Sequence, residues 1–179
     1  MISETILIGA ALSMDAFAVT VTSSLIYPEL KGIKKLSMPV AFSIFQGIMP
    51  VLGYLTGNLF YDFLKMYSGI ISFIVLGTVG FNMIKEGLKD EKENTGNYSI
   101  LLLILLSIAT SIDAFAVGIS FAAKGADIFK SSAIIAASTL ILTLCGLKLS
   151  NYANKKLGKK GVIYGGIVLI AIGIKSLFG

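Results

Sequence analysis

Two aspartates, Asp15 and Asp113, lie inside long apolar stretches of the chain, where a carboxylate has little water to solvate it. Both occur in the same motif, Asp-Ala-Phe-Ala-Val, and seven of the twelve positions from Ala11 to Thr22 match those from Ala109 to Ser120. A charged residue at the centre of a membrane helix costs about 2.5–3.5 kcal/mol on insertion scales, so intramembrane acids are usually functional. Two facing carboxylates would neutralise a divalent cation. The repeated motif therefore predicts a cation site.

Neutral oxygens near the motifs are candidates to complete this site. Ser13 and Ser111 lie two residues before the two aspartates, in register between the copies. Gln46 lies four residues before Pro50, which has no N–H to pair with the Gln46 carbonyl, so Gln46 offers a backbone oxygen and a side-chain oxygen. The alternative is that Pro50 only kinks its helix and that the serines only join helices. An all-oxygen set favours Mn²⁺, Mg²⁺ or Ca²⁺ over Cu⁺ or Zn²⁺.

Other ways to bind a metal or to neutralise the acids are few. The chain has no histidine, and its single cysteine, Cys145, excludes an internal disulfide and a cysteine-cluster metal site. No lysine lies at the middle of a predicted span to pair with the aspartates. A bound cation, protonation or hydrogen bonds to nearby hydroxyls must therefore compensate them. The competing interpretation is that two protonated acids join helices by hydrogen bonds.

The elements that carry these residues are membrane spans. Hydrophobic residues make up 55% of the 179 residues and charged residues only 14%, which is typical of an integral membrane protein. A span needs about 20 apolar residues. We therefore predict an all-α membrane protein whose six transmembrane helices lie near Ile2–Leu25, Leu36–Leu59, Tyr67–Leu88, Tyr98–Phe121, Phe129–Leu149 and Gly161–Phe178.

The sequence repeats beyond the aspartate motifs. At a shift of 93 residues Gly53 matches Gly146 and Gly80 matches Gly173. We predict two three-helix repeats, residues 1–88 and 98–179, joined by a charged linker at 89–97 within one membrane domain. Because three spans are an odd number, the second repeat enters the membrane inverted. Inverted repeats are typical of transporters whose substrate site lies near the midplane. Each aspartate lies on a stripe of small residues, so we expect the first and fourth spans to meet face to face.

The lysines predict the orientation. All fifteen basic residues are lysines, and eleven of them flank one side of the predicted spans. The positive-inside rule then places that side, including the connection Asn151–Lys160, in the cytoplasm and both termini outside. The four lysines on the other side are Lys65, Lys124, Lys130 and Lys175. No basic stripe with interleaved aromatics occurs, so we expect the lipid bilayer and no nucleic acid as a partner.

Several stretches resemble the bacterial MntP family of manganese efflux pumps. They are Ser13–Val19, Ala109–Gly118, Phe45-Gln46 with Pro50–Gly53, and Gly80 with Met83–Gly87, and the resemblance covers essentially the whole chain. It implies export of Mn²⁺ across the bacterial cytoplasmic membrane with Asp15 and Asp113 as the essential acids. A sporulation-associated group of membrane proteins shares this architecture.

We therefore expect a secondary transporter of a divalent metal, which by the resemblance is Mn²⁺, and no enzyme. No nucleotide-binding loop is found, so we do not expect ATP-driven transport, nor any cofactor besides the transported ion. The expected metal site comprises Asp15, Asp113, Gln46, Ser13 and Ser111. Two other functions stay open: a non-transporting membrane interaction protein, for example in sporulation, and a small amino-acid exporter.

Overall fold

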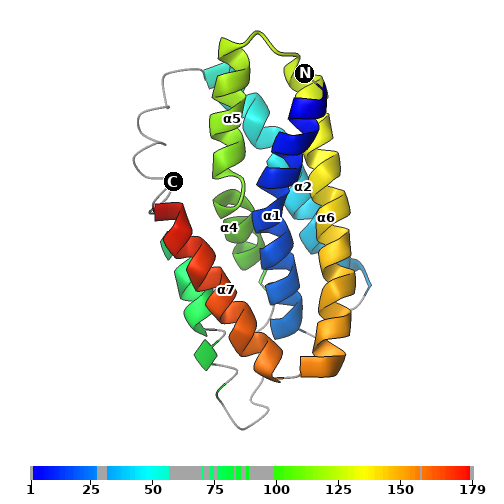
Figure 1. Cartoon of the computed structure of the whole chain (residues 1–179), viewed down its shortest axis with the longest axis vertical. Coiled ribbons are helices and arrows are strands. Elements are labelled where there is room, and N and C mark those ends of the chain that lie inside the picture. The colour runs from blue at the N-terminus through cyan, green and yellow to red at the C-terminus, as the bar shows by residue number, and fades with distance from the viewer. Residues whose placement is uncertain are drawn as a thin grey trace.

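The computed structural model describes residues 2–27, 32–56, 70, 73–74, 76–82, 84–85, 88, 99–157 and 159–177. Within these ranges the chain is helical and contains no strand. The helices, labelled as in Figure 1, are α1 (Ile2–Ile26), α2 (Ile33–Thr56), α4 (Ile100–Ala109), α5 (Ile112–Ala123), α6 (Ile128–Leu157) and α7 (Lys159–Leu177).

The helix lengths and compositions make this a multi-pass membrane protein. Three described helices, α1, α2 and α6, are long and apolar enough to cross a bilayer, and α4 with α5 forms a fourth span if the bent pair is counted as one. The apolar part of α7, Ile163–Lys175, is shorter. The predicted span Tyr67–Leu88 lies largely outside the described residues. The all-helical class is therefore confirmed, while the count of six spans stays a prediction.

Two details of the predicted layout are wrong. The fourth segment is not one continuous helix, because α4 and α5 meet at an angle of 41° across Thr110 and Ser111. The stretch that begins at Asn151 is not a connection, because α6 continues to Leu157. That stretch contains no glycine or proline before Leu157, so nothing in its sequence ends the helix.

The helices of the first half of the chain pack mainly against helices of the second half. α1 lies along α6, and α2 lies against α5 and α6, while α7 packs across α1 (Figure 1). The tightest contact joins α2 and α5. A Cβ atom at Gly53 would lie 2.0 Å from the Phe115 carbonyl oxygen, and one at Gly118 would lie 2.1 Å from the Pro50 carbonyl oxygen. The two backbones therefore touch directly, which only glycine permits at these positions.

The buried interior consists of two apolar clusters with polar residues between them. On α1, Leu12 belongs to one cluster and Ala16 and Val19 belong to the other. On the bent pair, Leu106 of α4 and Ala114 of α5 are divided in the same way. The buried polar residues at this boundary are Ser13, Gln46, Thr110, Ser111 and Thr139. This polar layer crosses the molecule at the level of the two aspartate motifs.

Candidate metal site

Gln46 of α2 connects the two aspartate motifs. Its side chain is completely buried, and its Nε2 donates hydrogen bonds of 3.0 Å to the carbonyl oxygens of Leu12 and of Thr110. Leu12 and Thr110 lie three residues before Asp15 and Asp113, so they are equivalent positions of the repeated motif. Two carbonyl acceptors require an NH₂ donor, which fixes the orientation of the amide. One side chain thus holds both motifs in place.

The break between α4 and α5 lies directly before Asp113. In a continuous helix the Ala114 N–H would donate to the Thr110 carbonyl oxygen. Here the Ala114 N–H instead donates to Asp113 Oδ1 at 2.8 Å, and the Thr110 carbonyl accepts from Gln46. Ser111 donates its hydroxyl to the Ser107 carbonyl at the end of α4. These substitute bonds let the helix bend without leaving the Thr110 carbonyl unpaired.

The other end of the Gln46 amide is open. Gln46 Oε1 is buried and has no hydrogen-bond partner among the described residues. A buried amide oxygen without a partner costs about 1–3 kcal/mol, so its retention needs an explanation such as an ion that binds there. The Gln46 carbonyl is a second oxygen, because Pro50 in the interior of α2 has no N–H to donate to it.

The two aspartates are accessible and close together. Asp113 is exposed and Asp15 is partly exposed, and their charges are near enough to interact. The helices that carry them do not pack as predicted, because the small-residue stripes of the first and fourth spans do not form a face-to-face interface. The main packing partners of α1 are α6 and α7, and that of α5 is α2. The likeness of the two motifs suggested direct packing, but the Gly53 and Gly118 contacts draw α5 onto α2 instead.

The two motif serines are buried beside the aspartates, with their hydroxyls directed at neighbouring groups. Ser13 lies 2.9 Å from the hydroxyl of Thr139 on α6 and donates to the Gly9 carbonyl. Ser111 is bonded to the end of α4, as described above. Thr139 was not among the predicted site residues, although the 93-residue shift pairs it with Gln46 and would have identified it.

A lysine lies nearer to the aspartates than the sequence suggested. Lys175, in the last turn of α7, is close enough to Asp15 for the two charges to interact. The prediction that no lysine lies at the middle of a span stays untested, but Lys175 acts on Asp15 through its charge. α7 ends at the level of the middle of α1, and not at the level of the N-terminal end of α1 (Figure 1).

The donor set at this site has a low charge. In the described ranges no three acidic, histidine or cysteine side chains come together as a metal cluster. The site thus offers two carboxylates and the neutral oxygens of Gln46, together with nearby hydroxyls. Such a set suits a hard divalent cation whose charge two carboxylates balance.

Comparison with known proteins points in the same direction. Residues 29–177 match the profile of a protein family described as "Mntp: Putative manganese efflux pump". A protein of Ruminiclostridium cellulolyticum with the name "Putative manganese efflux pump MntP" is 40% identical over 177 residues, which cover 97% of this chain and 94% of that protein. Proteins of the same name from Actinobacillus succinogenes and Methanosarcina mazei are 38% and 40% identical, over 95% and 96% of this chain and 92% of each relative. No solved structure matches the chain.

Proposed function

Since the chain belongs to the MntP family, we propose that it is a secondary transporter that exports Mn²⁺ across the cytoplasmic membrane. The substrate ion is bound between Asp15 and Asp113, near the middle of the membrane. Gln46 supplies a third oxygen, and Ser13 and Ser111 support the site through their hydrogen bonds.

The observation that carries this proposal is the Gln46 amide. Its NH₂ group binds the carbonyls of two equivalent residues, Leu12 and Thr110, so the side chain lies between the two acidic motifs. Its Oε1 is buried and has no partner in the described ranges. A neutral oxygen held next to the two acidic motifs is the kind of ligand that a hard cation takes once it has lost part of its water shell.

The aspartates supply the negative charge of the site and its preference for hard cations. Two carboxylates balance a divalent ion, so the loaded site is neutral and the loaded carrier avoids most of the cost of a charge inside the bilayer. With no nitrogen or sulfur donor, the site favours Mn²⁺, Mg²⁺ and Ca²⁺ over softer metals. Family membership favours Mn²⁺ among these three.

Inverted repeats, residues 1–88 and 98–179 with a linker at 89–97, give this carrier two alternating states. Contacts that map onto each other under the repeat support this part of the proposal. Gly53 approaches Phe115 and its equivalent Gly146 approaches Phe17, while Gly80 approaches Gly166 and its equivalent Gly173 approaches Phe73. Gly32 and Gly125, also 93 residues apart, both have positive φ angles, of 57° and 61°, shortly before α2 and α6.

The orientation follows from the lysines, with both termini outside the cytoplasm. Lys34 and Lys35 at the start of α2 and Lys148 late in α6 belong to the lysine-rich side. Asp127 and Lys130 at the start of α6 belong to the opposite side. The lysine-rich side faces the anionic inner leaflet.

The test measures cellular manganese by elemental analysis in an exporter-deficient strain loaded with manganese. The strain carries wild type, Asp15→Asn, Asp113→Asn, Asp127→Asn or an empty vector, at matched amounts in the membrane. Asp127 is exposed and lies outside the proposed site, so its variant is the matched control. We expect wild type and Asp127→Asn to lower manganese, and the other two variants to resemble the empty vector.

Two results would contradict the proposal in different ways. If wild type leaves every measured metal unchanged, metal efflux is wrong, and a membrane interaction protein or an exporter of another solute takes its place. If Asp15→Asn and Asp113→Asn both export as well as wild type, efflux stands and the aspartate site is wrong.

A further inference from the structure

Lys175 lies at an unusual place for a lysine of a membrane helix. It belongs to the last turn of α7, a helix of 19 residues. Figure 1 shows that the end of α7 nearest the C-terminus lies level with the middle of α1 and with the break between α4 and α5. The last turn of α7, which carries Lys175, thus lies near the depth of the break before Asp113 rather than at an outer edge of the helices.

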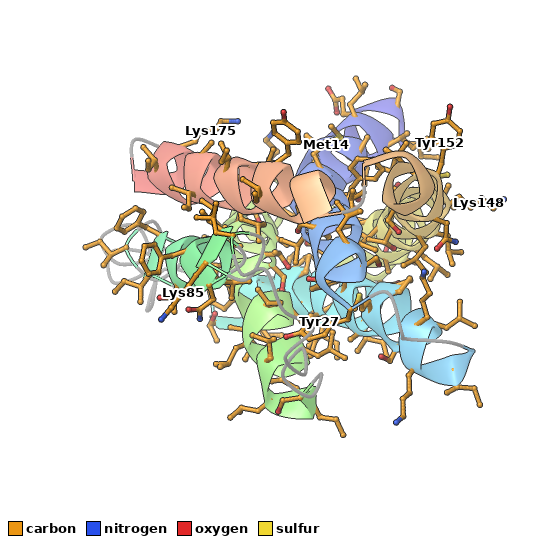
Figure 2. The ribbon with its side chains drawn as sticks, turned by 90° about the horizontal axis from the view of Figure 1, so that it is seen from below. Met14, Tyr27, Lys85, Lys148, Tyr152 and Lys175 are labelled. Atoms are coloured by element: carbon orange, nitrogen blue, oxygen red, sulfur yellow. The ribbon has the colours of Figure 1, made fainter. Side chains whose placement is uncertain are left out.

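Lys175 and the first aspartate motif lie on helices that pack together. α7 packs across α1. Viewed from below, Lys175 of α7 and Met14 of α1, the neighbour of Asp15, project from the same side of the molecule (Figure 2). The Lys175 side chain is exposed, and its charge interacts with that of Asp15. No ion pair with an acidic side chain is found for Lys175 among the described residues.

We propose that Lys175 is a tethered cation, which neutralises the aspartate site when no substrate ion is bound and is displaced when the metal enters. This inference rests on the proposed function, because it assigns a counter-charge to the same site. Lys175 acts as a positioning residue, since it approaches Asp15 and not the transported ion.

The role follows from the charge of the empty site. After the metal leaves, two carboxylates remain near the middle of the membrane, and the carrier must change state with them uncompensated. A lysine on a flexible four-carbon stem can approach them in the empty state and retreat in the loaded state. The tethered charge therefore weakens metal binding and speeds the return of the empty carrier.

The experiment measures equilibrium binding of Mn²⁺ to purified protein in detergent by isothermal titration, and Mn²⁺ efflux in the manganese-loaded strain. The variants are Lys175→Gln, Lys175→Arg and Lys124→Gln, the last being an exposed lysine of the same side that serves as the matched control. We expect Lys175→Gln to bind Mn²⁺ at least about tenfold more tightly, because the substitution removes a positive charge that repels the bound ion. The same variant should export more slowly than wild type. Lys175→Arg and Lys124→Gln should resemble wild type in both measurements.

The outcomes separate this inference from the proposed function. If wild type and Lys175→Gln bind Mn²⁺ with equal affinity, the tethered cation is wrong, whether or not efflux is observed. If Lys175→Gln binds more weakly and Lys175→Arg restores binding, Lys175 helps the metal to bind, which also overturns the inference. If wild type binds no Mn²⁺ at all, the proposed function fails and the inference fails with it. Thermal unfolding of each variant identifies a loss of binding that comes from misfolding.

Discussion

Gly53→Ala tests whether the direct contact between α2 and α5 holds the site together. The new Cβ atom would lie 2.0 Å from the Phe115 carbonyl oxygen and 3.2 Å from the Ile119 nitrogen. Both are backbone atoms, so no side-chain rotation can relieve the overlap. To reach an ordinary contact of 3.4 Å, α5 has to move away from α2 by about 1.4 Å.

This displacement acts on the site itself. Phe115 is two residues from Asp113, and Gln46 lies seven residues before Gly53, on the same face of α2. The Gln46–Thr110 hydrogen bond has a length of 3.0 Å, and a shift of that size would bring it beyond hydrogen-bonding distance. Overpacking of this kind costs about 1–3 kcal/mol. We expect Gly53→Ala to unfold at a clearly lower temperature than wild type and to lose most manganese efflux.

Gly146→Ala provides a matched control at the equivalent position of the second repeat. There the nearest atoms are Cδ2 of Phe17 at 3.2 Å, the Phe17 carbonyl oxygen at 3.3 Å and a Val21 methyl at 3.3 Å. The overlaps there are only a few tenths of an ångström, far smaller than the one at Gly53, so Gly146→Ala should stay much nearer to wild type. The assays are thermal unfolding in detergent and cellular manganese at matched expression. If Gly53→Ala unfolds and exports like wild type, or if Gly146→Ala is equally harmful, the argument from backbone contact is refuted.

Two further changes test the polar layer and a helix end. Gln46→Leu should lower the unfolding temperature and abolish Mn²⁺ binding in an isothermal titration. The substitution leaves the Leu12 and Thr110 carbonyls without this donor, and each buried unpaired group costs about 1–3 kcal/mol. If the variant binds Mn²⁺ like wild type, Gln46 does not belong to the site. Asp127 accepts a hydrogen bond from the Lys130 backbone N–H at the start of α6, and this bond together with the Lys130 ammonium holds the pKa of Asp127 below its usual value. The ionised Asp127 carboxylate therefore stabilises the fold fully above the usual carboxyl pKa, and this effect is lost as the pH falls through the lowered pKa. Asp127→Ala should slightly lower the unfolding temperature at neutral pH and leave it unchanged at strongly acidic pH. Asp127→Asn keeps a capping oxygen, so its unfolding temperature should fall less.

The sequence was sufficient to predict the long apolar helices. The predicted span Ile2–Leu25 differs from α1 by one residue, and the spans predicted at Leu36 and Phe129 begin within three residues of α2 and α6. These helices follow from continuous apolar length, which a bilayer demands of any spanning segment. Gln46 was also predicted as a site residue, from Pro50 and from its own side-chain oxygen, and this stays a prediction.

The break before Asp113 could not be predicted from local sequence. The same motif, Asp-Ala-Phe-Ala-Val, lies in unbroken helix in α1 and at the start of a new helix in α5. Neither copy contains a proline, and no glycine lies in the turn at Thr110 and Ser111. The bonds that replace the helical ones come partly from Gln46, 64 residues away in the chain. The motif itself is helical in both copies, and the chain breaks only at Thr110 and Ser111, whose counterparts Leu12 and Ser13 stay helical, so the tertiary bond from Gln46 to the Thr110 carbonyl contributes to the difference.

This difference between α1 and the α4–α5 pair has a consequence for the transport cycle that we propose. In an inverted repeat the two access states are related by an exchange of conformations between the halves. The bend at Thr110 should then pass to Leu12 in the opposite state, while α4 and α5 straighten into one rod. Two halves of identical sequence would make both states equally stable. Because Pro50 has Thr143 as its counterpart and Gln46 has Thr139, we expect the two states of the proposed carrier to differ in free energy and the unloaded protein to favour one of them.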